Sequence, residues 1–262
     1  MKRAIFRDGF AALLVTAILL PLAVLALMSL SREWRYPELW PASVQLRQWQ
    51  VFSAEWQPLF ATTVRSASLA LAVGIVASTA GFMTSRRIKL RAGYTRWLSL
   101  AILPFAVSPV VLGLSLGQSF TWLGLSGKYA GVALAQFPFA YAYAVLLTQG
   151  FWNRHTHALS ELALALGASE GAIWWRVRLP LARGLLVICL FQTALMSWFD
   201  FALARLIGAG RVETLPLKVF DYFGAGDLRL AAAAGVLLVA PPAVALLLNP
   251  RLLVPSIYRL PR

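Results

Sequence analysis

Long apolar stretches without a charged residue constrain this chain more than any other feature. A helix needs about 20 largely apolar residues to cross the hydrocarbon core of a bilayer. Four uncharged stretches reach that length, namely 9–31, 66–85, 129–153 and 230–249. Hydrophobic residues make up 60% of the chain and charged residues 13%, whereas soluble domains average about 45–50% and about 25%. We therefore exclude an ordinary soluble enzyme and predict an integral membrane protein.

Two further stretches complete the set of predicted spans. The uncharged stretch 97–127 is too long for one span and ends in Gly-Leu-Ser-Gly, a turn composition, so we predict one helix over 98–120. The stretch 184–204 is interrupted only by Asp200. All six stretches are continuously apolar and not alternating, which is typical of helices. The sequence thus predicts an all-α protein with six transmembrane helices.

The basic excess of the chain indicates how these spans are oriented. With 24 Lys and Arg against 10 Asp and Glu, the formal net charge is +14, which either nucleic acid or a membrane surface could explain. If the N-terminus is cytoplasmic, 15 basic residues fall on inside segments and 8 on outside segments. Lys and Arg gather on the cytoplasmic side of membrane proteins. We predict that both termini are cytoplasmic and that nucleic acid is not a partner.

The first span has an alternative interpretation as a cleaved signal peptide. Lys2, Arg3 and Arg7 precede its apolar run, as basic residues precede the core of a signal. A signal core has about 7–15 apolar residues, and this run is longer. We predict a retained span; cleavage would leave five spans and an outside N-terminus.

The longest inside segment, 153–184, has helical patterning without enough apolar length to span. Four residues recur at steps of three and four and form one apolar face: Leu159, Leu162, Ala163 and Leu166. Gly167 can close this helix, and Ser169 can start the next one. That second helix is predicted to end at Leu179-Pro180, where the fifth span begins. The segment is expected to form a helical hairpin at the membrane surface.

A family resemblance follows from the spacing within this hairpin. The chain has Glu161-Leu162-Ala163, three residues, Gly167, nine residues, Val177, one residue, then Leu179-Pro180. This pattern resembles the EAA loop of the inner-membrane permease subunits of binding-protein-dependent ABC importers. Leu162 replaces the central Ala and Val177 replaces Ile, both apolar exchanges. The resemblance implies an ABC importer permease (MetI-like) fold, with residues 1–262 as a single transmembrane permease domain and 153–184 as its coupling loop.

The resemblance also implies how the loop works. In such importers it forms the coupling helix, which docks into a groove of the ATP-binding subunit. Glu161 would pair with a basic residue of that subunit, Ala163 and Gly167 would permit close approach, and Pro180 would fix the hinge into the fifth span. The alternative is an amphipathic hairpin that holds two spans together at the interface.

Partners and cofactors are likewise implied by the resemblance. It predicts an ATPase dimer inside, a second permease chain in a homo- or heterodimer, an external substrate-binding protein, and a location in the bacterial inner membrane. No phosphate-binding Gly-rich loop followed by Lys-Ser/Thr occurs in the sequence, so ATP and magnesium are expected in the ATPase subunit, with no catalytic residue and no cofactor in this chain. His155 and His157 lack nearby Cys or acidic ligands, so no metal site is expected.

Two short stretches, 197–201 and 214–220, are similar to the permease branch that serves polyamines, ferric iron, thiamine and aminophosphonates. A small polar or charged solute is the expected substrate. Asp200, Arg65 and Trp198 are the candidate residues of the translocation path. Asp200 lies sixteen residues beyond Gly184, about 24 Å along a helix, near the level of Arg65. An acid inside a span faces a cavity or a charged partner, so Asp200 either lines the path or pairs with Arg65.

An ion-gradient-driven secondary transporter is the alternative function. Such proteins usually combine inverted repeats with several charges near the membrane midplane. Here only Asp200 and Arg65 qualify, and the sequence shows no internal repeat.

Overall fold

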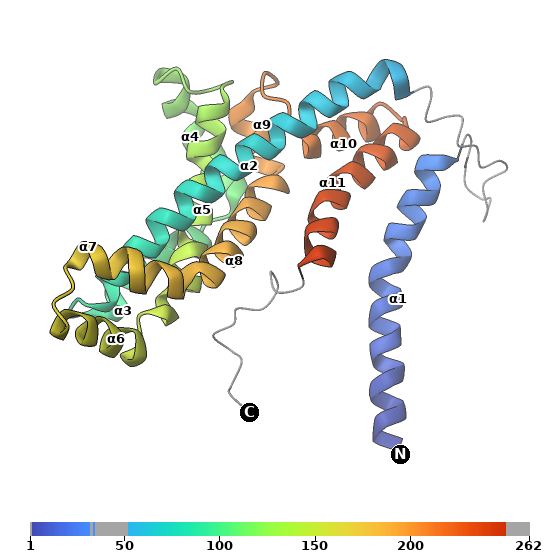
Figure 1. Ribbon diagram of the computed structural model, residues 1–262. Helices are drawn as coiled ribbons and strands as arrows, with labels where there is room; N and C mark the ends of the chain where they lie inside the picture. The colour runs from blue at the N-terminus through green and yellow to red at the C-terminus, as the bar shows by residue number, and fades with distance from the viewer. Residues whose placement is uncertain (1, 32–33, 35–51, 250–262) are drawn as a thin grey trace. The chain divides into compact units, whose positions relative to one another are not determined.

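The computed structural model describes residues 2–31, 34 and 52–249, which form helices joined by turns (Figure 1). The chain divides into two compact units. One contains Met1–Val64 and Thr214–Pro241, and the other contains Arg65–Glu213 and Pro242–Arg262. The all-α prediction is confirmed for the described residues, and the assignment of 1–262 to a single domain stays a prediction.

The first unit combines an N-terminal segment of the chain with a segment from its last fifth. It contains α1 (Lys2–Leu30), the start of α2 (Phe52–Lys89), α10 (Leu215–Gly224) and most of α11 (Leu228–Leu248). A Cβ atom added to Gly235 on α11 would lie 3.2 Å from the Cδ2 atom of Leu25 on α1. Small residues allow helices within a membrane to approach closely, so α1 and α11 pack through a glycine.

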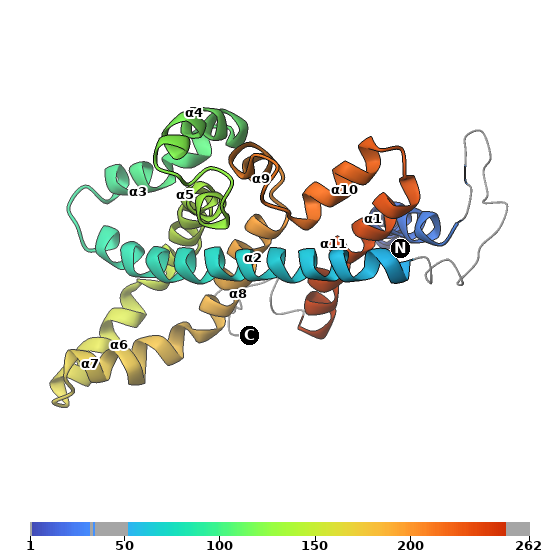
Figure 2. The same ribbon diagram turned by 90° about the horizontal axis from the view of Figure 1, so that it is seen from above.

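The second unit holds the rest of α2 and most of the remaining helices. They are α3 (Tyr94–Ile102), η2 (Leu103–Ala106), α4 (Pro109–Trp122), α5 (Tyr129–Thr148), η3 (Gln149–Phe151), α6 (Arg154–Ala165), α7 (Glu170–Ile173), η4 (Trp174–Arg178), α8 (Leu179–Trp198) and α9 (Ala202–Gly208). The central helix is α5, which contacts α3, α4, α8 and α9 (Figure 2). The α6–α7 hairpin lies at one end of this unit, and α4 and α9 lie at the other (Figure 1).

Two glycines of α2 allow the close packing of this unit. A Cβ atom at Gly81 would lie 2.4 Å from the Cβ atom of Ala144 on α5, and one at Gly74 would lie 3.0 Å from that of Ala194 on α8. A side chain at either position would push the helices apart. Thr193 adds a hydrogen bond from its hydroxyl to the carbonyl of Gly74, at 3.3 Å. Helix α2 is therefore held directly against α5 and α8.

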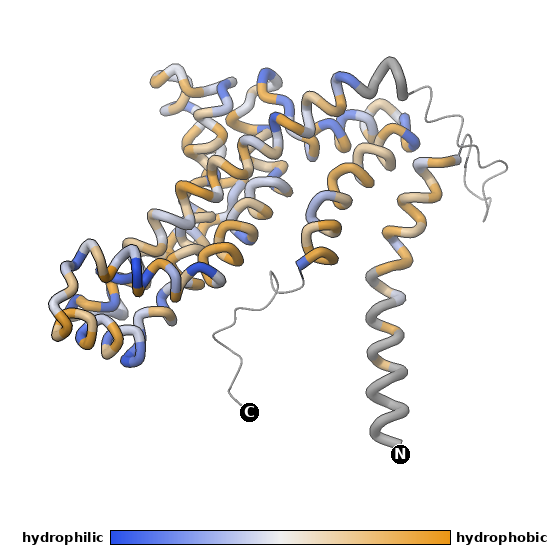
Figure 3. The backbone as a smooth tube through the Cα atoms, in the orientation of Figure 1, coloured by the Kyte–Doolittle hydropathy of each residue, from blue (hydrophilic) through white to orange (hydrophobic). Residues whose placement is uncertain are grey.

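Four helical segments are long and apolar enough to cross a membrane: Gln57–Lys89, Tyr129–Phe151, Glu170–Trp198 and Leu228–Leu248. A fifth is obtained if the bent pair Tyr94–Ala106 and Pro109–Trp122 counts as one span. The first predicted span corresponds to α1, whose apolar segment among the residues searched is Leu19–Leu30. Apolar residues run along these helices, whereas polar residues gather at the α6–α7 end (Figure 3). Six spans and cytoplasmic termini stay predictions.

The prediction of one helix over 98–120 is wrong. The two helical parts meet at an angle of 88°. Val107 and Ser108 between them have extended backbones, with ψ of 132° and 137°. Pro109 explains this break, because a proline disfavours helical geometry in the residue before it and suits the first turn of the next helix.

The fifth span also differs from the predicted 184–204. Helix α8 begins at Leu179 and ends at Trp198, so Asp200 lies in a break before α9 and not inside a span. The Asp200 carboxylate accepts hydrogen bonds from the backbone N–H groups of Leu203 and Ala204, at 3.4 and 3.0 Å. An aspartate that caps a new helix in this way favours an interruption over a continuous helix.

Candidate functional site

Helix α6, which carries the Glu-Leu-Ala motif, has specific residues at both ends. Asn153 caps its start, since Oδ1 accepts a hydrogen bond from the backbone N–H of Thr156 at 3.0 Å. At its end Gly167 adopts φ of +82°, as predicted for a closing glycine. The N–H of Gly167 donates to the carbonyl of Leu164 at 2.9 Å, and that of Ala168 to the carbonyl of Ala163 at 3.0 Å. This pair of bonds is a Schellman motif, which fixes the direction in which the chain leaves the helix.

The second arm of the hairpin begins as predicted but does not end as predicted. Ser169 caps α7, because its Oγ accepts a hydrogen bond from the N–H of Ala172 at 3.3 Å. The helix then continues through the π-helical turn η4 into α8, and Pro180 lies in the first turn of α8. The prediction that Leu179-Pro180 ends this helix is wrong. A proline is tolerated in a first turn, and the wider π turn before it replaces the regular hydrogen-bond ladder.

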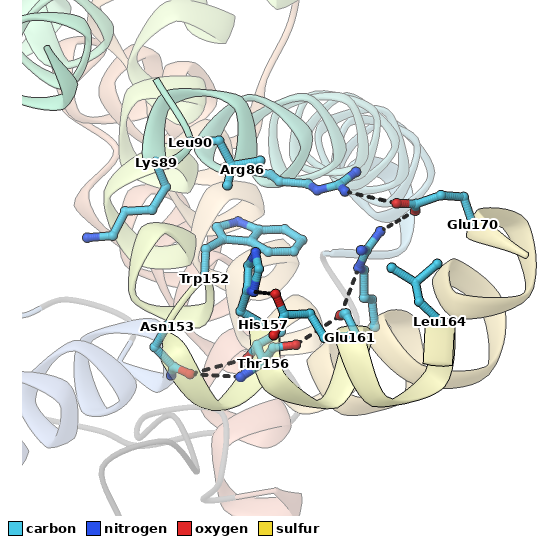
Figure 4. A pocket seen from close by; sticks show the side chains of 12 residues that line it. Arg86, Lys89, Leu90, Trp152, Asn153, Thr156, His157, Glu161, Leu164 and Glu170 are labelled. Carbon is cyan, nitrogen blue, oxygen red and sulfur yellow. Dashed lines mark hydrogen bonds and ion pairs between the residues drawn. The ribbon is translucent and has the colours of Figure 1, made fainter. Parts of the chain in front are cut away.

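A buried arginine ties the two arms of the hairpin together. Arg178 on η4 is only 6% exposed. Its Nε donates to Oγ of Ser160 on α6 at 3.2 Å, and its Nη1 lies 2.8 Å from Oε2 of Glu170 on α7. Glu170 also lies 3.9 Å from Nη2 of Arg86 on α2, and Figure 4 shows these two side chains pointing toward each other. We call Arg86, Ser160, Glu170 and Arg178 the hairpin clamp.

Aromatic rings pack against one another and against Arg86 of the hairpin clamp. The ring centroids of Phe82 and Trp152 are 4.9 Å apart, and those of Phe82 and Phe151 are 5.5 Å apart. The guanidinium of Arg86 lies 5.3 Å from the centroid of Trp174, within cation–π range. The indole N–H of Trp152 donates to Oγ of Ser85 at 2.8 Å. The hairpin is thus joined to the ends of α2 and α5 by packing as well as by charge.

A pocket of about 220 Å³ lies between the end of α2 and the hairpin. Arg86, Lys89 and Trp152 line one side, and His157 and Glu161 line the other (Figure 4). Nδ1 of His157 lies 3.2 Å from Oε1 of Glu161, and both side chains are exposed. The carboxylate of the motif therefore lies at the rim of a charged pocket.

Part of the apolar face of α6 points away from the rest of the unit, while Leu159 and Ala163 on the same face are half-buried. Leu162 is 59% exposed and Leu166 is 79% exposed, whereas Thr156 and Ser160 are buried. The other residues of the motif are exposed or half-buried: Glu161, Ala163, Gly167, Val177, Leu179 and Pro180. This helix buries polar side chains against its own chain and leaves leucines outside, the reverse of an ordinary surface helix.

A second cavity, of about 490 Å³, lies where the two broken helices face α5. Val107 and Ser108 line it from the first break, and Asp200 lines it from the second. Gln136 on α5 donates through Nε2 to Oδ2 of Asp200 at 2.9 Å, and its Oε1 accepts a hydrogen bond from Oγ of Ser197 at 2.6 Å. These polar groups form one network on an otherwise largely apolar wall.

Of the three residues predicted for the translocation path, Asp200 alone lines this cavity. Nη1 of Arg65 lies 3.6 Å from Oε2 of Glu213, so the ion pair considered between Arg65 and Asp200 is not formed. Trp198 is buried, 6% exposed. The path role of Arg65 and Trp198 stays a prediction. Gln136, which also lines this cavity, is not among the residues predicted from the sequence. Its polar amide within the apolar stretch 129–153 is the feature that could have indicated it.

The family of the chain follows from comparison with known proteins. Residues 70–258 match the family described as the binding-protein-dependent transport system inner membrane component. The chain belongs to this family. The resemblance inferred from the motif in the hairpin 159–180 is therefore confirmed. Members of this inner membrane component family are transport subunits and not enzymes.

Several curated proteins are similar to this inner membrane component. The molybdenum transport system permease protein ModB of Mycobacterium tuberculosis is 30% identical over 172 residues, which cover 56% of this chain and 61% of the relative. The putative 2-aminoethylphosphonate transport system permease protein PhnV of Salmonella typhimurium is 26% identical over 237 residues, 87% of this chain and 86% of the relative.

The spermidine/putrescine transport system permease protein PotC of Haemophilus influenzae is 23% identical over 235 residues, 86% of this chain and 88% of the relative. The matched part of the chain thus spans about three-fifths of the ModB relative and most of the other two. The relatives named for aminoethylphosphonate and spermidine/putrescine transport agree with the branch that the sequence resembles.

Proposed function

We propose that this chain is the transmembrane permease subunit of an ABC importer, coupled through the hairpin 159–180 to a separate ATPase subunit. The observation that carries the proposal is the exposed apolar face of α6. Leu162 and Leu166, one turn apart, are both largely exposed, and Ser160 on the opposite face of the same helix is held by the hairpin clamp. An apolar helix face of this kind docks in a groove of a partner protein.

The hairpin clamp supports a coupling role because it links the docking helix to the spans. Force applied to α6 would pass through Ser160 and Arg178 into η4 and α8, and through Glu170 and Arg86 into α2. Ion pairs and aromatic packing make this block stiff, so that α6 would move together with the ends of these helices. Glu161 at the edge of the docking face would pair with a basic residue of the ATPase subunit.

The rest of the assembly follows from this role. The chain would lie in the bacterial inner membrane with six spans and both termini inside. It would pair with a second permease chain, identical or different, and receive solute from an external binding protein. ATP and magnesium would bind to the ATPase dimer, and this chain would hold no cofactor and no metal.

The cavity beside Asp200 is the proposed part of the translocation path. Broken helices that meet at a cavity offer polar groups to a solute inside a membrane. The Asp200 carboxylate, with Gln136 and Ser197 beside it, would favour a small polar solute with a cationic group, as in polyamines or aminophosphonates, with thiamine or ferric iron as the other candidates of this branch. If Asp200→Asn left both the uptake rate and the preference among these solutes unchanged, this role would be wrong.

The coupling role is tested by changing the apolar face of α6. We expect Leu162→Asp and Glu161→Lys to abolish ATP-driven uptake in membrane vesicles while the subunit still inserts and folds. Thr95→Asp, an exposed residue at the start of α3, is the matched control and should transport normally. Full ATP-driven uptake by Leu162→Asp would contradict the proposal.

A secondary transporter driven by an ion gradient is the second candidate. The observation that favours it is the carboxylate at a pair of helix breaks, an arrangement also found in gradient-driven transporters. The two candidates separate in proteoliposomes that contain only this chain. Uptake driven by a proton gradient would support the secondary transporter, whereas uptake that requires an ATPase subunit and ATP supports the importer.

A further inference from the structure

An apolar groove of about 430 Å³ lies behind the hairpin, between α2 and the helix that runs from α7 into α8. Phe82 and Met83 line it from α2, and Trp174, Trp175 and Leu179 line it from the other side. Trp175 is 74% exposed. Tryptophan is enriched where the apolar core of a bilayer meets its polar surface. The groove therefore has the composition of a surface that faces lipid near the membrane interface.

Three exposed arginines belong to the two helical segments that form the groove. Arg87 follows Met83 by four residues on α2, and Arg183 follows Leu179 by four residues on α8, so each lies on the face of a groove residue. Arg176 is the neighbour of Trp175 in sequence. Within the described part of the chain, none of these three arginines forms an ion pair. An apolar groove is thus flanked by cations that lack a counter-charge.

Arg183 directly precedes the uncharged stretch that begins at Gly184, so it lies where the apolar part of its helix begins. Arg183 belongs to a helical segment long and apolar enough to span the membrane. Charged residues within such segments are rare and normally have a partner. Side chains on a helix lean toward its N-terminus, so the guanidinium of Arg183 is directed back toward the turn that holds Leu179.

We propose that this groove binds an anionic phospholipid of the surrounding bilayer, with an acyl chain along Phe82, Met83 and Leu179 and the phosphate at Arg87, Arg176 and Arg183. An acyl chain matches the apolar wall, and the phosphate supplies the counter-charge. Basic pockets between transmembrane helices on the cytoplasmic side bind acidic headgroups. The inference rests on the chain being a membrane subunit, and it is independent of coupling to an ATPase.

The bound lipid would also support the coupling hairpin. Phe82 and Trp174 line the groove and at the same time belong to the aromatic cluster beneath the hairpin clamp. An acyl chain in contact with both rings would restrict their movement. The lipid would therefore stabilise the connection between the docking helix and α2.

The first test measures lipid binding to the full purified chain by native mass spectrometry, with phosphatidylglycerol and phosphatidylcholine titrated separately. We expect phosphatidylglycerol to bind more tightly. The double variant Arg87→Gln with Arg183→Gln should lose roughly 30-fold of that preference, for two cations near a membrane surface. Arg96→Gln, an exposed arginine on α3, a helix that contributes no residue to the groove, is the control and should behave as wild type. Equal binding of the two lipids, or an unchanged preference in the double variant, would overturn the proposal.

The second test locates the lipid and does not depend on the arginine variants. Met83→Cys can be labelled with a fluorophore, because the natural Cys189 is fully buried and out of reach. Brominated phosphatidylglycerol should quench this label more strongly than brominated phosphatidylcholine at equal mole fraction. Equal quenching by both lipids would show that the groove does not select an anionic lipid. Absence of quenching by either lipid, because a second copy of the chain covers the label, would show that the groove is a protein interface.

Discussion

Gly167 offers the sharpest test of the hairpin, because its energetic role can be worked out from the backbone alone. Its φ of +82° lies in the left-handed region, and an added Cβ atom would meet nothing within 4 Å. A substitution therefore causes no steric clash and costs only conformational energy. For Gly167→Ala this cost is about 1–2 kcal/mol. Gly167→Asn should cost less, since Asn tolerates this conformation, and Gly167→Val should cost more because it is β-branched.

The expected consequence is a hairpin that opens more often. A cost of 1–2 kcal/mol changes the ratio of closed to open hairpin by about 5–30-fold. Hydrogen exchange at the N–H groups of Gly167 and Ala168, which form the Schellman motif, should accelerate by that factor in Gly167→Ala. ATP-driven uptake should fall in the order Asn, Ala, Val, while insertion into the membrane stays normal.

Gly171 provides a matched control in the same hairpin. It lies in α7, its φ is not in the left-handed region, and an added Cβ atom would also meet nothing within 4 Å. Gly171→Ala should leave uptake intact and stabilise α7 by about 0.5–1 kcal/mol. If Gly167→Ala showed the same hydrogen-exchange rates and the same ATP-driven uptake as Gly171→Ala, the role assigned to the Schellman motif would be refuted.

Three further changes test the packing and the hydrogen bonds that hold the site. Gly81→Leu should lower the melting temperature in detergent by separating α2 from α5, at a cost of about 1–3 kcal/mol, whereas Gly150→Ala, where the space is open, should not. Asn153→Ala should cost α6 about 1 kcal/mol by removing its cap, seen as faster hydrogen exchange at Thr156, and Asn153→Ser should restore most of it. Arg178→Gln should destabilise the hairpin by about 1.5–3 kcal/mol in a denaturant titration, because it removes the charged hydrogen bond to Glu170. The Glu170 carboxylate is largely exposed, so water can solvate it in the variant. An unchanged melting temperature, exchange rate or denaturation midpoint would contradict the respective assignment.

Features encoded by near neighbours could be predicted from the sequence. The closing role of Gly167 and the capping role of Ser169 depend on residues three to five positions away, and both are present in the structure. The apolar spans were likewise visible as long uncharged stretches. Hydropathy, however, does not report whether such a stretch is straight. The break at Ser108 has a local signal in Pro109, whereas the sequence around Asp200 indicates only a charge inside an apolar stretch.

Interactions between distant elements could not be predicted in the same way. Arg178 and Glu170 are eight residues apart, and Arg178 is the last residue of a π turn, so no regular helical spacing indicates their contact. Gln136 and Asp200 are 64 residues apart and meet only because α5 passes both helix breaks. The apolar periodicity of α6 was predicted, but not that its leucines point outward. Which face is buried depends on the polar partners of Thr156 and Ser160, and these contacts exist only in the folded hairpin.

The most direct measurement for the proposed coupling is cysteine cross-linking between α6 and an ATPase subunit in native membranes. Leu166→Cys places a thiol on the most exposed leucine of the docking face, and Leu123→Cys places one on an equally apolar, exposed position after α4 as a control. We predict a cross-linked product of this chain with an ATP-binding subunit from position 166, with a yield that changes when ATP is added, and none from position 123. Position 166 giving no such product, in a complex that still transports, would contradict the docking of α6 on an ATPase.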